Sequence, residues 1–166
     1  MTERFDEAFA RRAPDLAIRA ERDDDITFLK TLFIACSQLV GLVPPEMIDF
    51  QAETQRASHR RAYPSAMHRV VEQSGAPIGR AMIDWNADAT HLIDIAVLPE
   101  ARPTRAGRAL LNAWLEVADV AGLSATLQVM RDNPALAIYR KLGFFVLSDH
   151  PPDDPVLEMR REIVSA

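Results

Sequence analysis

Hydrophobic positions between His91 and Phe144 follow four successive patterns. An apolar run, HLIDIAVLP, comes first, and a segment with apolar residues at helical spacing follows it. Residues 123–129 then alternate strictly between apolar and polar, and a second helical segment ends at Gly143. A spacing near 3.6 residues indicates an amphipathic helix, whereas a spacing of two indicates a strand. The order strand, helix, strand, helix therefore predicts a parallel βαβ unit with one further helix attached.

The N-terminal residues have a helical pattern of their own. An apolar residue recurs at every fourth position from Phe5 to Ala13, which predicts a short helix that ends before Pro14. We interpret residues 1–14 as an N-terminal extension that is either frayed or an arm that contacts a partner. Residues 15–166 are then expected to form a single domain.

A short strand near Leu16 and a helix that ends at Cys36 come next. The three aspartates at 23–25 are expected to cap the N-terminus of this helix with their side-chain oxygens. Its apolar stripe consists of Ile26, Leu29, Phe33 and Cys36. Because Cys36 lies on that stripe, we expect a buried thiol rather than a nucleophile.

Further patterns complete a sheet of about seven strands. A helix from Pro45 to about Arg61 is polar for its length, so it is either a solvated surface helix or a helix whose polar side lines a substrate cleft. Strand patterns flank the turn Ser-Gly-Ala at 74–76 and predict a hairpin. The segments FFVLS and PVLEMRREI predict a final pair of strands. The fold class is therefore α/β, an α+β mixed sheet with a central parallel βαβ unit and flanking helices.

Composition excludes several classes of protein. A formal net charge of −5 argues against general nucleic-acid binding, which favours basic surfaces. The single cysteine excludes a disulfide framework, and no Cys/His cluster has metal-ligand spacing, so we expect no metal. The charged N-terminus is unlike a secretory signal, and no apolar run is long enough to span a membrane. We expect a cytoplasmic protein without membrane or nucleic-acid partners.

Two segments of the central unit resemble the signatures of one superfamily. The segment VLPEARPTRAGRALL resembles the acetyl-CoA loop of the GNAT N-acetyltransferases, and NPALAIYRKLGF resembles their second signature. The order of elements over residues 15–163 is also similar. The resemblance implies a GNAT-like fold, a single N-acetyltransferase domain over residues 15–166 and acetyl-CoA as co-substrate. It implies direct transfer of acetyl to a primary amine of a small molecule or a protein.

The phosphate-binding turn departs from the family pattern, which is Arg or Gln, two residues, Gly, one residue, then Gly or Ala. Glycine at the first of these positions would let the backbone approach phosphate closely, but here Arg105 replaces it. Pro103 also lacks an N–H. Arg105 and Arg108 in turn supply charge-assisted donors. The loop either binds acetyl-CoA or is a degenerate remnant. The implied cofactor-binding residues of this region are Ile95, Ala96, Val97, Arg102, Pro103, Thr104, Arg105, Ala106, Gly107 and Arg108.

The family resemblance also implies how the cofactor arm is held and where the thiolate finds a proton. The pantetheine arm would lie like a strand between residues 92–98 and 123–129. Tyr139 matches the tyrosine that protonates the departing thiolate, and a phenol with a pKa of ~10 suits that task. Alternatively, Tyr139 only packs on the core. Asn133 either contacts the cofactor or only caps its helix.

The general base and the acceptor site are open at this stage. His91 stands where several family members have a glutamate base, Asp94 is a carboxylate in an otherwise apolar strand, and a water chain is a third possibility. We expect Gln51, Gln55 and Tyr63 on the acceptor side, because the polar helix should overhang the cleft. The alternative function is a non-catalytic acyl-CoA-binding or interaction module on the same fold. A homodimer is the default if the enzyme is oligomeric.

Overall fold

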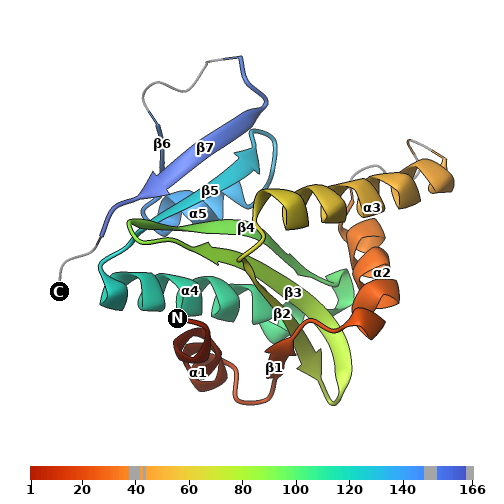
Figure 1. Cartoon of the computed structure of the whole chain (residues 1–166), viewed down its shortest axis with the longest axis horizontal. Coiled ribbons are helices and arrows are strands. Elements are labelled where there is room, and N and C mark those ends of the chain that lie inside the picture. Colours follow the sequence, from red (N-terminus) through yellow and green to blue (C-terminus); the bar gives the residue numbers. More distant parts are fainter. Residues whose placement is uncertain (38–41, 43, 148–152, 164–166) are drawn as a thin grey trace.

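Seven strands form one sheet in the order β1-β2-β3-β4-β5-β7-β6 (Figure 1). The strands are β1 (Ala17–Ala20), β2 (Met67–Gln73), β3 (Ala76–Trp85), β4 (Ala89–Val97), β5 (Ser124–Met130), β6 (Phe145–Val146) and β7 (Val156–Arg161). Every neighbouring pair is antiparallel except β4 and β5, which are parallel. The predicted mixed sheet with a central parallel βαβ unit is therefore confirmed.

The computed structural model describes residues 1–37, 42, 44–147 and 153–163. Ser148, which the sequence assigned to the sixth strand, lies outside these ranges. The helices are α1 (Thr2–Arg12), α2 (Ile26–Cys36), α3 (Pro45–Ala62), α4 (Ala106–Ala121) and α5 (Leu136–Lys141), with short 3-10 helices η1 (Asp23–Asp25) and η2 (Pro99–Thr104). Within the described ranges, none of the helices has the length and apolar character needed to cross a membrane.

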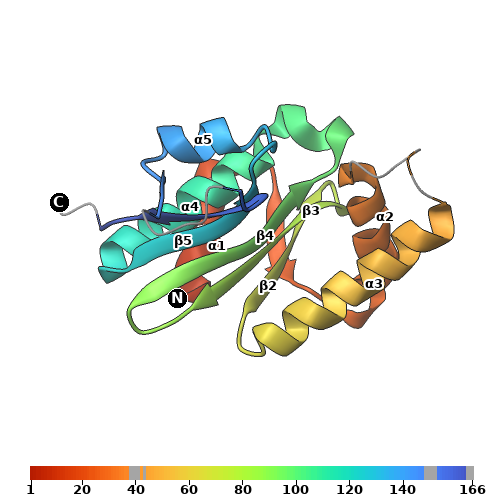
Figure 2. The ribbon, with the colours of Figure 1, turned by 90° about the horizontal axis from the view of Figure 1, so that it is seen from above.

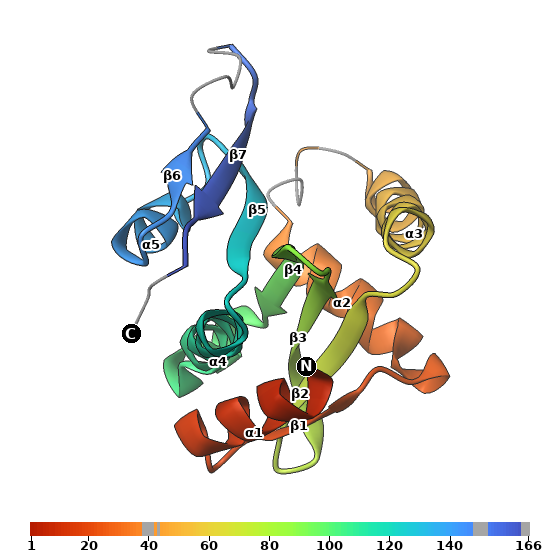
Figure 3. The same cartoon turned by 60° about the vertical axis from the view of Figure 1, so that its left-hand side comes forward.

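The helices cover the two faces of the sheet unequally. Helices α1 and α4 lie on one face, and α2 and α3 lie on the other, as Figures 2 and 3 show from two directions. The hydrophobic core is densest under α4, where Trp114 is fully buried. Its indole N–H donates to the Thr90 hydroxyl at 2.9 Å and so joins α4 to β4. The face under α2 and α3 is more polar.

Helix α1 is part of the core. Phe5 and Phe9 are fully buried, and α1 lies along α4, where Arg11 forms an ion pair with Glu116 at 2.5 Å. The interpretation of residues 1–14 as a frayed or partner-seeking extension is therefore wrong for α1. Its apolar residues at every fourth position form the face that covers the sheet, and its charges lie on the outer side.

Helix α2 differs from expectation in both its cap and its buried stripe. The Asp25 carboxylate accepts no cap hydrogen bond from α2. It instead accepts two hydrogen bonds from the Arg19 guanidinium and one from the backbone N–H of Arg22, each at 2.7 Å. Such a bidentate charge-assisted pair is stronger than a cap bond, which explains the preference. The buried residues of α2 are Leu29 and Leu32. Cys36 is exposed, so the predicted buried thiol is wrong; of the four residues assigned to the apolar stripe, Leu29 is the one that α2 buries.

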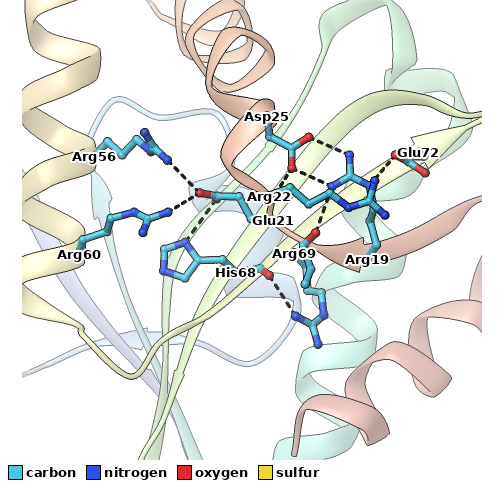
Figure 4. Close-up of polar contacts among 10 residues, drawn as sticks. Arg19, Glu21, Arg22, Asp25, Arg56, Arg60, His68, Arg69 and Glu72 are labelled. Atoms are coloured by element: carbon cyan, nitrogen blue, oxygen red, sulfur yellow. Dashed lines mark hydrogen bonds and ion pairs between the residues drawn. The ribbon is translucent and has the colours of Figure 1, made fainter.

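A buried carboxylate fixes α3 over the sheet (Figure 4). The Glu21 side chain, only 4% exposed, accepts hydrogen bonds from Arg60 at 2.8 Å and from Arg56 at 3.4 Å. Its second oxygen lies 3.3 Å from Nδ1 of His68 on β2. These partners outweigh the cost of burial and lower the pKa of Glu21 to about 2. Among the described side chains of α3, Ile48 is the one hydrophobic residue that is buried. The polar contacts of Glu21 are therefore important for the position of α3.

Truncation of Phe5 tests whether α1 belongs to the core. Phe5→Ala is expected to lower the free energy of unfolding by about 3–5 kcal/mol, because a fully buried ring is lost and a cavity remains. Glu7→Ala on the exposed side of the same helix is the control and should change it by less than about 0.5 kcal/mol. Urea denaturation followed by circular dichroism measures both. Equal midpoints for the two variants would show that α1 is not a core element.

Neutralisation of Glu21 tests the anchor of α3. A carboxylate whose pKa is lowered in the folded state contributes stability above its unfolded pKa and loses it as the pH falls through the folded pKa. The Glu21→Gln variant should therefore be less stable at pH 7 by on the order of 3 kcal/mol, at about 1.4 kcal/mol per pKa unit. The difference from the parent protein should shrink between pH 4.5 and 2. A difference that does not change with pH in denaturant titrations would contradict this assignment; Glu7→Gln is the control.

Candidate active site

Strands β4 and β5 pair over a short length and then separate. Their pairing ends at Leu92 and Leu127, although β4 continues to Val97 and β5 to Met130. Figure 3 shows the two strands diverging from this point. Within the described structure, the backbone of residues 93–97 therefore has an edge on the β5 side with no strand paired to it. Such an edge can accept an extended, amide-containing ligand as if it were another strand.

A β-bulge in β4 lies where the two strands separate. Met82 and Asp84 are two residues apart in β3, whereas their partners Asp94 and His91 are three residues apart in β4. Ile93 is the additional residue. In a regular strand, residues three apart point to opposite faces. The bulge thus brings His91 and Asp94 to the same face of the sheet, the one under α2 and α3.

Asp94 has the partner that a carboxylate in this strand requires. Its Oδ2 accepts a hydrogen bond of 2.6 Å from Nε of Arg80 on β3. The Arg80 side chain is only 9% exposed, so the ion pair is largely shielded from water. Burial of either charge alone would be costly, and the pair compensates for it. Arg80 was not recognised from the sequence, because its partner depends on cross-strand register.

His91 is neutral and has a defined tautomer. Its Nδ1 lies 2.9 Å from the hydroxyl oxygen of Thr126, and that hydroxyl donates to the Thr90 carbonyl. Since the hydroxyl proton is already used, Nδ1 must be the donor, which leaves the lone pair on Nε2. Burial lowers the pKa of His91 below its usual 6.5. The Tyr63 ring stacks on the imidazole at 5.5 Å. A neutral imidazole with a free Nε2 lone pair is suited to accept a proton.

Tyr139 is held by an aromatic cluster. It is 8% exposed, and its ring meets Phe144 edge-on at 6.0 Å, while Phe144 stacks on Trp114 at 5.8 Å. Burial raises the pKa of Tyr139, and the charge of Asp94 raises it further. The phenol therefore keeps its proton at neutral pH and can donate it. The packing on the core that the sequence left open is confirmed, and the catalytic role stays a prediction.

The turn before α4 has a left-handed residue, Arg105, at the position where the sequence pattern has its first glycine. Arg105 has φ 61° and ψ 19°, in the left-handed region, which costs a residue other than glycine roughly 1–2 kcal/mol. Thr104 compensates locally: its hydroxyl donates to the Ala101 carbonyl at 2.6 Å and accepts from the Ala106 N–H at 3.2 Å. The cationic residues of this turn, Arg102, Arg105 and Arg108, are all exposed. The turn thus places three cations at the N-terminus of α4.

Asn133 caps the turn before α5. Its side-chain oxygen accepts a hydrogen bond of 2.8 Å from the N–H of Ala135. The helix begins at Leu136, two residues later than expected from Pro134. The predicted helix cap is therefore wrong, because Ala135 is the N-cap residue of α5 and Asn133 stabilises only the preceding turn. A contact of Asn133 with cofactor stays a prediction.

Two further side chains without a predicted functional role lie at this site. The Cys36 thiol donates to the Val97 carbonyl at 3.5 Å; burial raises the pKa of the thiol, and nearby Arg102 partly opposes this. His59 of α3 has a buried Nδ1 without a hydrogen-bond partner in the described structure, and burial lowers its pKa. Its position one helical turn before Tyr63 was the signal that could have identified His59.

The three predicted acceptor-side residues have different environments. Gln55 lines a cavity of about 280 Å³ between α2, α3 and β3, and Tyr63 stacks on His91. Gln51 is exposed and is not among the residues that line this cavity. The structure therefore brings Gln55 and Tyr63 to the face with His91 but leaves Gln51 at the surface. Among the described residues, no group of three His, Cys, Asp or Glu side chains could hold a metal ion.

The chain is similar to known acetyltransferases in profile and in fold. Residues 9–144 match the acetyltransferase (GNAT) family, and no curated protein matches the chain by sequence. The PaiA N-acetyltransferase from Thermoplasma acidophilum in complex with coenzyme A is 18% identical, with a TM-score of 0.69 over 89% of this chain and 98% of that one. The ribosomal-protein-S18-alanine N-acetyltransferase from Escherichia coli is 22% identical, with a TM-score of 0.66 over 91% and 96%. PH1933 from Pyrococcus horikoshii OT3 is 14% identical, with a TM-score of 0.72 over 90% and 99%.

At these identities, the likeness to solved structures shows the fold. The family match is stronger information, because it spans residues 9–144 of the 166-residue chain and includes the separated strands, the turn before α4 and the helix with Tyr139. The chain belongs to the acetyltransferase (GNAT) family.

Proposed function

We propose that this protein is an N-acetyltransferase that moves an acetyl group from acetyl-CoA directly to a primary amine of a small molecule or a protein. The separation of β4 and β5 is the observation on which the proposal rests. It provides an unpaired backbone edge at residues 93–97, next to the cationic turn that begins α4. Family membership supports acetyl transfer in general, and the residues below supply the specific roles.

The residues around the separation fit the cofactor. The backbone of Ile95, Ala96 and Val97 can pair with the amides of the pantetheine arm. The N-terminus of α4, at Ala106 and Gly107, can accept a diphosphate, because its N–H groups and the helix dipole favour anions. Additional donors for phosphate come from three exposed arginines and the Thr104 backbone, whereas Pro103 contributes no N–H. When bound, acetyl-CoA supplies the activated acetyl thioester.

The chain supplies a proton acceptor and a proton donor for the transfer. The amine is protonated at neutral pH and must lose a proton before its nitrogen forms a bond to the acetyl carbon. Nε2 of neutral His91 accepts that proton, directly or through water, with the Asp94 carboxylate as the alternative acceptor. The carbon–sulfur bond breaks, and the Tyr139 hydroxyl donates its proton to the leaving thiolate.

A non-catalytic acyl-CoA-binding or interaction module is the alternative. The left-handed Arg105 and the missing N–H of Pro103 favour it, since both weaken a phosphate-binding turn. This module would bind the same ligand on the same strand edge and would not release free CoA.

Acetyl-CoA titration and turnover of the Tyr139 variant test the proposal together. Acetyl-CoA at 100 times its dissociation constant should stabilise the protein by about 2.7 kcal/mol in a thermal-unfolding assay. A panel of amines, amino acids and peptides should contain one that releases CoA. With that amine, Tyr139→Phe should lower kcat by roughly 10²–10⁴-fold and leave the affinity for CoA within about twofold.

Three other outcomes would reject parts of the proposal. No stabilisation by millimolar acetyl-CoA would reject both the enzyme and the binding module. Stabilisation without CoA release across the panel would favour the module. An unchanged kcat for Tyr139→Phe would remove Tyr139 from the mechanism.

The pH dependence of kcat/KM tests His91 as the proton acceptor. Because burial lowers the pKa of His91, the neutral form predominates above pH 6.5, and activity should fall only at lower pH, as the ring becomes protonated. His91→Asn should lower kcat/KM at pH 7.5 and remove that decline between pH 5 and 6.5. Glu7→Ala, at an exposed position of α1, serves as the control. An acid limb that persists in His91→Asn would assign the titration to another group.

A further inference from the structure

The cavity between α2, α3 and β3 has an apolar side and a cationic side. Residues Ile26, Leu29 and Phe33 of α2 form the apolar side. The cationic residues that line it are Lys30, Arg56, Arg60 and Arg80. Glu53 is the one acidic residue among the lining side chains of the described structure. The chain is acidic as a whole, so the cationic lining of this cavity contrasts with the net charge of the protein.

Pairing within the protein leaves part of this charge uncompensated. Lys30 pairs with Asp49 at 2.8 Å, and Arg80 pairs with Asp94. Arg56 and Arg60, however, share the single carboxylate of Glu21 (Figure 4). Two guanidinium groups thus share one carboxylate, whereas Lys30 has the charges of both Asp49 and Glu53 nearby. The cationic character of the cavity is therefore concentrated at Arg56 and Arg60, which suits one monoanionic group.

Arg56 has a donor ready for that anion. Its contact with Glu21 is long, at 3.4 Å, and its Nε is buried with no hydrogen-bond partner in the described structure. A buried donor without a partner costs about 1–3 kcal/mol. Arg80 lines the same cavity, and its side chain is 9% exposed. A carboxylate binds the planar guanidinium fork with two parallel hydrogen bonds, so it is the group best matched to these two arginines.

The size of the cavity limits the ligand. A volume of about 280 Å³ is near the lower end of the range for small-molecule sites. An amino acid with an aliphatic side chain has this size. Its side chain would contact the apolar residues of α2.

The position of Arg80 connects the cavity with the proposed chemistry. Its Nε binds Asp94, and the β4 bulge places Asp94 on the same face as His91. In an α-amino acid, the amine and the carboxylate are attached to the same carbon. A carboxylate held at Arg56 and Arg80 would therefore keep the amine close to Arg80, whose guanidinium binds Asp94. Nδ1 of His59, which has no partner in the described structure, lies near this ion pair.

We propose that the acetyl acceptor is an amino acid with a free carboxylate and an apolar side chain, and that the cavity between α2, α3 and β3 binds it through Arg56 and Arg80. This inference rests on the proposed acetyl transfer for its functional meaning. The binding site itself can be tested without turnover.

Calorimetric titration of N-acetylleucine and N-acetylleucinamide tests the site directly, because the two compounds differ in the carboxylate alone. The acid should bind at least tenfold more tightly than the amide. Arg56→Gln should remove this preference, and Arg56→Lys, which keeps the charge but loses Nε and the fork, should retain part of it. Arg61→Gln is the matched control: Arg61 is exposed on the same helix and does not line the cavity, so the preference should stay within twofold.

Equal affinity for acid and amide, or no binding of either, would overturn the proposal. It would also be overturned if Arg61→Gln lost the preference for the acid as fully as Arg56→Gln.

CoA release supplies a second comparison: leucine should be a better acceptor than 3-methylbutylamine by at least tenfold. The failures are distinguishable. Binding of the acid without any response to acetyl-CoA would keep this site and reject the proposed enzyme. A response to acetyl-CoA with no preference for the acid would reject this amino-acid site and leave the proposed acetyltransferase in place.

Discussion

The early end of pairing between β4 and β5 is the constraint on which the rest of the site depends. One additional residue, Ile93, interrupts β4, and the two parallel strands separate after Leu92. The unpaired edge at residues 93–97 is the strand-like site available to a cofactor arm. The same bulge reverses the alternation of side chains and brings His91 and Asp94 to one face. A single irregularity thus creates both the cofactor edge and the group of polar side chains beside it.

The helices on the two faces of the sheet are attached around the β4 bulge in different ways. On one face, α4 is attached to β4 by Trp114 and Thr90, and the aromatic cluster that holds Tyr139 continues from the same tryptophan. On the other face, α3 depends on the buried carboxylate of Glu21 more than on apolar contacts. The side proposed to bind the cofactor is therefore built on a buried apolar core. The side proposed to bind the acceptor is built on ion pairs, which leave donors that a substrate can use.

Hydrophobic spacing was enough to predict the order of the strands and helices and the parallel βαβ unit, because burial of one face determines that spacing. Features that depend on contacts between distant residues could not be predicted. Regular alternation would separate His91 from Asp94, and the Arg80 partner follows only from the observed register. Asp25 does not cap α2 with its side chain, because Arg19 of β1 binds both of its carboxylate oxygens. Likewise, the sequence pattern predicts an N-terminal extension at residues 1–14, whereas Phe5 and Phe9 of α1 are core residues.

Hydrogen–deuterium exchange of the protein with and without acetyl-CoA tests the central claim most directly. If the separated edge of β4 receives the pantetheine arm, amide exchange in residues 93–97 should slow when acetyl-CoA is added, together with exchange at the start of α4. Exchange in β2, which is paired on both sides, should not change. Slower exchange elsewhere, with residues 93–97 unaffected at saturating acetyl-CoA, would contradict the account.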